Sequence, residues 1–479
     1  MEDSLLLPPR ELKGKRLIGY SMGDLGLSLG NIFLGVFIFQ YYVYTINLNA
    51  LLVSIGTTTQ LIIGALFSII FGVIVDNKRP GKLGKRRPFL LIGIPIWFIT
   101  GILIWIPPWK CPEGNSMYIP TAIYFWVLII IRSISRSLLF NVYVSMLPEQ
   151  SQTLKNRESV ASIRSGFAIT ASIVALLLPI IIQSIVEDPT NVKWWQPSGK
   201  IVLFYIPIIA VCFAIFGLIA VIIIFFSVDE SFHKKSPPTE KKKISLTETF
   251  KGMALPAKDR NFRFLIIAGF FGGISGRIVG VLVFPFQTYV LNFTAGLFYF
   301  YVLISILGKY GWYLVWMRLR KRNQLLKSYS YAITLAIIAS FLGTFFLVGI
   351  LPFELQIILY ILTWSTVLGS MYSVPLFSIP ITAALVNEAA EDTNDFKIDE
   401  AMSKISGSYY GLSQFIASMG PATASIFIGF LLSGANESNA TILVLLFVSM
   451  GIFYFIAFLA IRKIRIKQTS LYNYKQVES

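Results

Sequence analysis

The chain has 479 residues, of which 55% are apolar, 15% are aromatic and only 14% are charged. Soluble domains carry about 25% charged residues, so the composition excludes a water-soluble globular protein of this length. The net charge of +17 would suggest a nucleic-acid partner for a soluble protein. Here the basic residues gather in alternate loops between apolar segments, and membrane topology explains them better.

Twelve apolar segments follow one another along the chain. Each is long enough to cross a bilayer core of about 30 Å, which requires about 20 helical residues. The clearest is 201–227, which contains no charged residue. The pattern predicts an all-α membrane protein with spans at 17–45, 52–75, 88–107, 119–147, 158–186, 201–227, 262–290, 296–317, 328–350, 355–385, 404–433 and 440–461.

The loops between the spans differ in charge. Six Lys or Arg residues lie between Lys78 and Arg87, and five lie between Arg318 and Lys327, whereas the loops on the other side hold very few. By the positive-inside rule, these basic loops and both termini are cytoplasmic. We therefore expect a multi-pass protein of the cell membrane that has no nucleic-acid partner.

Residue types that carry catalysis or hold metals are scarce. The two cysteines, Cys111 and Cys212, cannot form a disulfide framework. The single histidine, His233, lies in a Lys-rich polar segment, and no cluster of His, Cys and carboxylate residues accompanies it. We expect no catalytic residues, no metal site and no cofactor, which argues against a membrane enzyme. The N-terminus has no apolar core of a cleaved signal peptide.

The longest polar segment, 228–261, predicts a cytoplasmic linker between two six-helix bundles, 1–227 and 262–479. Internal matches support this division. FQYYVY from Phe39 corresponds to FQTYVL from Phe286, and ESVASIRSGF from Glu158 corresponds to EAMSKISGSY from Glu400. Parallel repeats of this kind are typical of the two halves of major facilitator transporters, whose substrate site lies near the membrane midplane.

Several motifs resemble one transporter family. GKLGKRRPF, from Gly81 to Phe89, resembles the R-x-x-G-[KR]-x-R-P-[FY] motif of the glycoside–pentoside–hexuronide transporters, the melibiose-carrier family of the major facilitator superfamily. IGYSMGDLG in the first span, SMLPE after the fourth and GSYYGLSQFIASMGPATA in the eleventh resemble further motifs of that family. The resemblance covers essentially the whole chain and implies the major facilitator fold, with twelve helices in two six-helix bundles.

The departures from the family pattern concern ion coupling. Sodium-coupled members carry an Asp-x-x-x-Asp pair in the second span, and the matching positions here are Gly64 and Ser68. The carboxylate of the fourth span is replaced by Phe140, and the lysine of the eleventh by Ser418. A sodium site of carboxylate oxygens therefore lacks its ligands, and we favour a proton as the coupling ion.

Six ionisable residues fall inside predicted spans, where a charge is costly and usually faces a cavity. They are Asp24, Arg132, Arg136, Arg164, Arg277 and Lys309. Five cations against one anion would give a shared cavity a positive potential, which favours an anionic substrate. The alternative is that some of these cations are structural and pair with backbone carbonyls or extend to the cytoplasmic face.

The candidate substrate-binding residues combine cations with amides that suit a sugar ring. Arg164 lies near the position of a substrate-binding arginine in the resembled family. The coupling or gating candidates are an intramembrane acid, an intramembrane lysine and two arginines of the basic loop; Asp24 could also pair with a loop arginine such as Arg86. The substrate-binding set is Arg164, Arg136, Arg277, Asn141 and Gln414, and the coupling or gating set is Asp24, Lys309, Arg86 and Arg87.

The predicted function is secondary active transport of a sugar or sugar-derived solute, neutral or anionic, by alternating access, as a symporter. We expect a monomer whose partners are the solute, the coupling ion and membrane lipid. A lysophospholipid or other organic-anion carrier of the same fold is the alternative, because a basic cavity suits a phospholipid headgroup equally well. A channel is less compatible with the two-half repeat.

Overall fold

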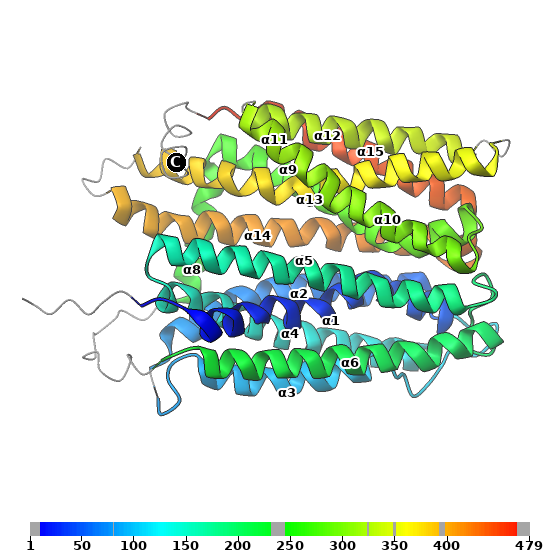
Figure 1. Cartoon of the computed structure of the whole chain (residues 1–479), viewed down its shortest axis with the longest axis horizontal. Helices are drawn as coiled ribbons and strands as arrows, with labels where there is room; N and C mark the ends of the chain where they lie inside the picture. The colour runs from blue at the N-terminus through cyan, green and yellow to red at the C-terminus, as the bar shows by residue number, and fades with distance from the viewer. Residues whose placement is uncertain are drawn as a thin grey trace, which may run out of the picture. The chain divides into compact units, whose positions relative to one another are not determined.

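The computed structural model of the chain describes residues 10–79, 81–230, 245–322, 325–347, 351–391 and 398–466. Within these ranges the regular elements are helices, and the only β-pairing is an isolated bridge between Gly81 and Gly84 (Figure 1). The α-helices are α1 (Gly14–Gln40), α2 (Ala50–Asn77), α3 (Arg87–Leu103), α4 (Ile119–Gln150), α5 (Leu154–Ile185), α6 (Pro197–Ser227), α8 (Leu246–Ala254), α9 (Arg260–Pro285), α10 (Phe300–Ile306), α11 (Trp312–Arg322), α12 (Leu325–Leu342), α13 (Phe353–Glu391), α14 (Ile398–Leu431) and α15 (Ala440–Arg462).

Eleven helical stretches of the described residues are long and apolar enough to cross a membrane. The prediction of an all-α, multi-pass membrane protein is confirmed. The predicted third span, 88–107, differs because α3 ends at Leu103 and has 17 residues. Its last carbonyls are bonded from outside, since the Tyr42 hydroxyl donates to the Ile104 carbonyl and the Tyr41 hydroxyl to the Trp105 carbonyl, both at 2.7 Å. Helix ends inside an apolar environment require such partners.

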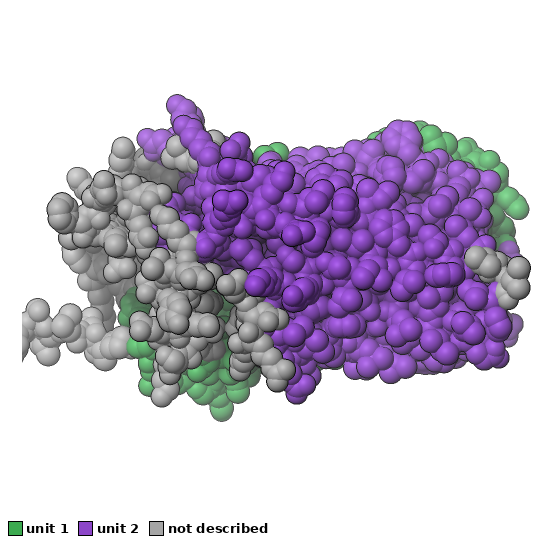
Figure 2. Space-filling view, turned by 90° about the horizontal axis from the view of Figure 1, so that it is seen from above, with its two compact units in different colours: residues 1–47, 66–182, 192–244 green, residues 48–65, 183–191, 245–479 purple. Residues whose placement is uncertain are grey.

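Contacts divide the chain into two compact units. The first contains residues 1–47, 66–182 and 192–244, and the second contains 48–65, 183–191 and 245–479. Figure 2 shows them in green and purple. The main part of the second unit begins at Ser245, inside the predicted linker. His233 lies outside the described residues, and the assignment of 1–227 and 262–479 as separate bundles stays a prediction.

The first unit is organised around α1 and α6, which pack side by side, with α3 against both α4 and α6. Small residues allow the close approach of α1 and α6: a Cβ added at Gly26 would lie 2.2 Å from the Ala220 Cβ. Such contacts replace the hydrophobic driving force that is weak between helices in lipid. Trp97, Tyr20 and Tyr143 belong to the buried cluster at the centre of this unit.

In the second unit, α9 packs against α14 and α15, and α12 packs between α13 and α15. Glycines again set the spacing. A Cβ at Gly420 of α14 would lie 2.2 Å from the Phe270 carbonyl of α9. Asp259 caps α9 by accepting hydrogen bonds from the Asn261 and Phe262 amides. Aromatic side chains around Trp364 and Phe447, whose rings stack 5.2 Å apart, fill the other end of this unit.

Candidate functional site

Asp24 of α1 and Arg164 of α5 form a salt bridge inside the first unit. Arg164 Nε donates to Asp24 Oδ2, and Nη2 lies 3.3 Å from Oδ1, so the guanidinium binds both carboxylate oxygens. The side chains are 18% exposed for Arg164 and 14% for Asp24. Bidentate pairs of this kind are stronger than single hydrogen bonds and fix the orientation of both groups. The structure thus brings together one predicted binding residue and one predicted coupling residue.

Two tyrosines hold this pair in place. The Tyr143 hydroxyl of α4 donates to Asp24 Oδ2 at 2.9 Å, and the Arg164 guanidinium lies 4.8 Å from the centroid of the Tyr143 ring. The Tyr20 hydroxyl donates to the Tyr143 carbonyl at 2.6 Å, and both rings are buried. The carboxylate therefore accepts three hydrogen bonds, and the cation also has an aromatic face. We call Asp24, Arg164, Tyr143 and Tyr20 the acid–arginine cluster.

The acid–arginine cluster lies deep within its helices. Asp24 follows the start of α1 at Gly14 by ten residues, and Arg164 follows the start of α5 at Leu154 by ten residues. At about 1.5 Å per residue, both lie roughly 15 Å along their helices, and Arg164 follows the start of its apolar span at Ser159 by five residues. Charged residues within membrane spans mark transport pathways and proton relays in membrane proteins.

The Asp24 carboxylate is bonded to Arg164 and Tyr143, whereas its pairing with Arg86 stays a prediction. Arg86 and Arg87 instead donate to the carbonyls of Ser145 and Val228, at the ends of α4 and α6. Their backbone amides face one carboxylate: Glu230 Oε2 lies 3.0 Å from the Arg86 nitrogen and 3.5 Å from the Arg87 nitrogen. The basic loop is thus fastened within the first unit.

The two arginines of α4 have different environments. Arg132 is 5% exposed, donates to the Trp97 and Gly30 carbonyls at 3.2 and 3.3 Å, and lies over the Trp97 ring. Its bonds to backbone carbonyls explain it as a structural residue. Arg136, one turn further along α4, has an exposed side chain. It is therefore accessible to a ligand.

Asn141 is held on α4 by two hydrogen bonds. Its Nδ2 donates to Ser68 Oγ at 2.9 Å and to the Ser137 carbonyl at 2.8 Å. Ser68 occupies one of the positions at which sodium-coupled relatives carry a carboxylate. In this chain the position holds the Ser68 hydroxyl, which accepts a hydrogen bond from the Asn141 amide. Across the described ranges, no group of three or more His, Cys, Asp and Glu side chains comes together to hold a metal ion.

The remaining candidates lie in the second unit and are not brought together. Arg277 Nε of α9 donates to Ser425 Oγ of α14 at 2.9 Å. Lys309 is buried in the π-helix Leu307–Gly311, with Nζ 4.7 Å from the ring centroid of Tyr372. Gln414 of α14 has an exposed side chain. Short π-helices inside long helices are frequent at functional sites, which keeps Lys309 among the gating candidates.

The internal repeat is visible in backbone conformation. α1 continues into the π-helix Tyr41–Thr45, α9 continues into the π-helix Phe286–Val290, and each is followed after one residue by an asparagine with positive φ, Asn47 at 68° and Asn292 at 52°. Aligning the two π-helices pairs Tyr41 with Phe286. Aligning the two FQ motifs in the sequence pairs Phe39 with Phe286 instead, so the two alignments differ by two residues. Two segments with the same unusual geometry at the same place support a repeat.

Three residues that were not among the candidates from the sequence contribute to the sites seen in the structure. Tyr143 belongs to the acid–arginine cluster, Glu230 binds the basic loop, and Tyr454 of α15 lines a cavity of the second unit. The chain has 22 tyrosines, and no periodicity distinguishes a tyrosine that binds a carboxylate from one that faces lipid. Glu230 had one available signal, because Asp229 and Glu230 are the first acids after the uncharged span 201–227.

The helical spans, the repeated helix ends and the charged pair within the spans define the class as a polytopic membrane transporter of the major facilitator type. A family model described as MFS/sugar transport protein matches residues 19–462. The chain belongs to this family. The predicted placement in the major facilitator superfamily is therefore confirmed, and the family is one of transporters, not enzymes.

Among curated proteins, the chain is 24% identical over 247 residues to the "Uncharacterized symporter YjmB" of Bacillus subtilis (strain 168). The match covers 50% of this chain and 49% of that protein, so it spans about half the length of the relative.

Solved structures share the fold at low sequence identity. The nucleoside transporter NupG has a TM-score of 0.62 at 13% identity, and the match covers 95% of this chain and 100% of that chain. A D-xylose-proton symporter has a TM-score of 0.61 at 14% identity, covering 95% and 98%. A bacterial homolog of the human lysosomal transporter Spinster has a TM-score of 0.62 at 11% identity, covering 95% and 97%. The major facilitator fold is thereby established.

Proposed function

We propose that the chain is a secondary active transporter that moves a sugar or sugar-derived, anionic solute across the membrane by alternating access, in symport with a proton. The observation that carries this proposal is the Asp24–Arg164 salt bridge within the first unit. The family description, the relative named a symporter and a structural neighbour that is a D-xylose-proton symporter support the solute class and the coupling.

The salt bridge couples solute and proton through competition for one cation. An anionic group of the solute that binds Arg164 displaces the Asp24 carboxylate. A carboxylate left without its cation in a low-dielectric site takes up a proton, because burial disfavours the charged form. Conversely, protonation of Asp24 releases Arg164 for the solute. Each ligand therefore increases the affinity of the other, as linkage requires, and the two are carried together.

Other residues complete the proposed machinery. In the first unit Arg136 and Asn141 are the further substrate contacts, because one is an exposed cation and the other an amide two residues from Tyr143. Arg277 and Gln414 are the proposed contacts of the second unit. Lys309, Arg86 and Arg87 act in gating, since the π-helix around Lys309 and the fastened basic loop are the places where a conformational change would alter local geometry.

A proton is preferred to sodium because Gly64 and Ser68 occupy the positions of the missing carboxylate pair. The same topology that follows from the basic loops places both termini on the cytoplasmic side of the cell membrane. The two halves of a major facilitator transporter enclose its substrate site between them, so we propose that the chain acts as a monomer.

Reconstitution into proteoliposomes tests the mechanism. Arg164→Ala should abolish uptake with expression unchanged, because it removes the cation for which the solute and Asp24 compete. Asp24→Asn should retain solute exchange at equal concentrations on both sides, but it should lose accumulation driven by a pH gradient, since Asn cannot carry a proton. Glu113→Gln, which removes an exposed acid from a loop, is the matched control and should behave as the unaltered protein.

The same vesicles separate the alternatives. A screen of neutral sugars, uronates, sulfonated sugars and lysophospholipids identifies the solute, and transport of lysophospholipids alone would replace the sugar proposal by the lipid-carrier alternative. Accumulation that requires a sodium gradient at constant pH would refute proton coupling. Normal uptake by Arg164→Ala would remove Arg164 from the site.

A further inference from the structure

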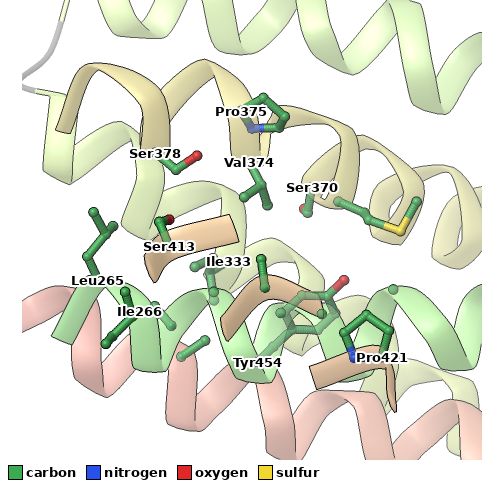
Figure 3. A pocket seen from close by; sticks show the side chains of 18 of the residues that line it. Leu265, Ile266, Ile333, Ser370, Val374, Pro375, Ser378, Ser413, Pro421 and Tyr454 are labelled. Carbon is green, nitrogen blue, oxygen red and sulfur yellow. The ribbon is translucent and has the colours of Figure 1, made fainter. Parts of the chain in front are cut away.

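A cavity of about 510 Å³ lies in the second unit, and none of its lining residues belongs to the acid–arginine cluster (Figure 3). Its walls come from α9, α12, α13, α14 and α15, with Leu61 of α2, and all of these residues belong to the second unit. A volume of this size falls within the range of about 300–1,000 Å³ that is typical of small-molecule sites.

Glycine positions on α9 explain why the cavity exists. Gly269, Gly272 and Gly276 are spaced by three and four residues, so they share one face of the helix, and all three line the cavity. A Cβ at Gly269 or Gly272 would meet nothing within 4 Å. The adjacent Gly273 packs tightly instead, because a Cβ there would lie 2.8 Å from Pro421 Cδ of α14. Close packing at Gly273 therefore fixes α9 while its neighbours face empty space.

One polar group of the cavity is buried without a partner. Tyr454 is 2% exposed, and its hydroxyl lies near Ser275 but makes no hydrogen bond of normal geometry within the described part of the chain. Figure 3 shows its ring among the lining side chains, in the region of Pro421. A buried hydroxyl without a partner is costly, and such groups in native structures call for an explanation. A ligand atom in the cavity would supply the missing bond.

The rest of the wall is mostly apolar, with a single formal charge. Leu265, Ile266, Ile333 and Val374 contribute hydrocarbon, Ser370, Ser378 and Ser413 contribute hydroxyls, and Arg277 contributes the positive charge. A bare sugar would leave many of its hydroxyls against this hydrocarbon without hydrogen bonds, which is unfavourable. An apolar body that carries one negative group would satisfy both parts of the wall.

We propose that this cavity binds a small amphipathic organic anion, whose carboxylate, sulfonate or phosphate is paired with Arg277, whose apolar body occupies the space beside Gly269 and Gly272, and whose polar atom bonds to the Tyr454 hydroxyl. The site shares Arg277 with the proposed solute contacts of the second unit, and it goes beyond the proposed symport because it requires neither Asp24 nor Arg164. The anion can come from the aqueous phase or from an anionic lipid of the bilayer, and both sources share this chemistry.

Binding of naphthalene-2-sulfonate to the full chain in phosphatidylcholine nanodiscs, measured by titration calorimetry, tests the site. The uncharged naphthalene-2-sulfonamide and the hydrophilic anion glucuronate should each bind at least about tenfold more weakly, because a hydrogen bond to a charged group contributes roughly that factor or more. Arg277→Gln should weaken sulfonate binding by about tenfold or more, and Tyr454→Phe by roughly two- to tenfold.

A pair of glycine substitutions supplies the matched control. Gly272→Leu fills the cavity and should abolish binding. Gly280→Leu adds the same side chain to the same helix, also where a Cβ meets nothing within 4 Å, but outside the cavity, and it should leave binding unchanged. If Gly272→Leu does not fold, Arg277→Gln and the nearly isosteric Tyr454→Phe decide the question.

Replacing part of the phosphatidylcholine by phosphatidic acid distinguishes the two sources of the anion. If phosphatidic acid weakens sulfonate binding, the site takes a lipid anion; if sulfonate binding is unchanged, the site takes a soluble anion. Sulfonate affinity that is equal in the unaltered protein and in a folded Gly272→Leu variant, or in Arg277→Gln and Tyr454→Phe, would overturn the proposal. The measurement is of binding, so its outcome is independent of whether Asp24 and Arg164 support symport.

Discussion

Gly84→Ala should destabilise the first unit far more than an ordinary loop substitution. Gly84 has φ of +92°, and an added Cβ would lie 1.9 Å from Glu230 Oε2 and 2.6 Å from Glu230 Cβ. Glu230 is 2% exposed and accepts from the Arg86 amide at the start of α3. The alanine therefore imposes an unfavourable backbone conformation and also expels the carboxylate that caps α3.

The magnitude follows from these two effects. A left-handed backbone costs an L-residue about 1–2 kcal/mol, and a lost hydrogen bond to a charged group costs about 1.5–3 kcal/mol, which together give roughly 2.5–5 kcal/mol. Gly114 provides the control, because its φ is +78° and a Cβ there would meet nothing within 4 Å. Gly114→Ala should therefore cost only about 1–2 kcal/mol.

Thermal unfolding of the purified variants in one detergent is the assay. Since 1 kcal/mol corresponds to about 2–4 °C in Tm for domains of 150–250 residues, Gly84→Ala should unfold at least ~3 °C below Gly114→Ala. In a Glu230→Ala background the additional effect of Gly84→Ala should shrink, because the cap is already absent. Equal Tm values for Gly84→Ala and Gly114→Ala would refute the role assigned to Glu230.

Two further predictions concern the basic loop and a loop thiol. Replacing Arg86 and Arg87 by Gln should change transport rate through the inward–outward balance, and it should leave solute affinity unchanged in protein locked outward-facing; lost affinity in the locked state would place the loop in the site. Burial raises the pKa of the Cys111 thiol to about 11, so maleimide labelling of Cys111 in a Cys212→Ser variant should be slow near pH 7 and should rise with pH as thiolate forms. Rapid labelling at pH 7 in the folded protein would contradict this, and unfolding in detergent should restore normal reactivity.

The membrane fold could be predicted from local properties of the chain. The apolar segments specify spans because a helix satisfies its own backbone hydrogen bonds in lipid, a requirement that each segment meets by itself. The motif from Gly81 to Phe89 and the matching helix ends indicated the superfamily in the same way. The prediction was inexact for α3, where the Tyr41 and Tyr42 hydroxyls of another segment bond to the carbonyls that follow Leu103.

The pattern of charges could indicate which residues matter but not which ones meet. Asp24, Arg132, Arg136 and Arg164 are all ionisable residues of apolar spans, and spacing along the sequence does not show which of them meet. Arg132 proved to be bonded to backbone carbonyls, whereas Arg164 proved to be bonded to Asp24.

Pairings of this kind join residues more than 100 positions apart, such as Asp24 with Arg164 and Glu230 with the basic loop. They depend on which helices approach closely and on which faces they turn toward one another, and glycines such as Gly26 set these distances. The sequence by itself thus determined the membrane class, the spans and the candidate charges, because lipid imposes those requirements on each segment separately. The tertiary structure alone decided the acid–arginine cluster, the fastening of the basic loop and the cavity beside Gly272, because each is made by side chains that only packing brings within hydrogen-bond or contact distance.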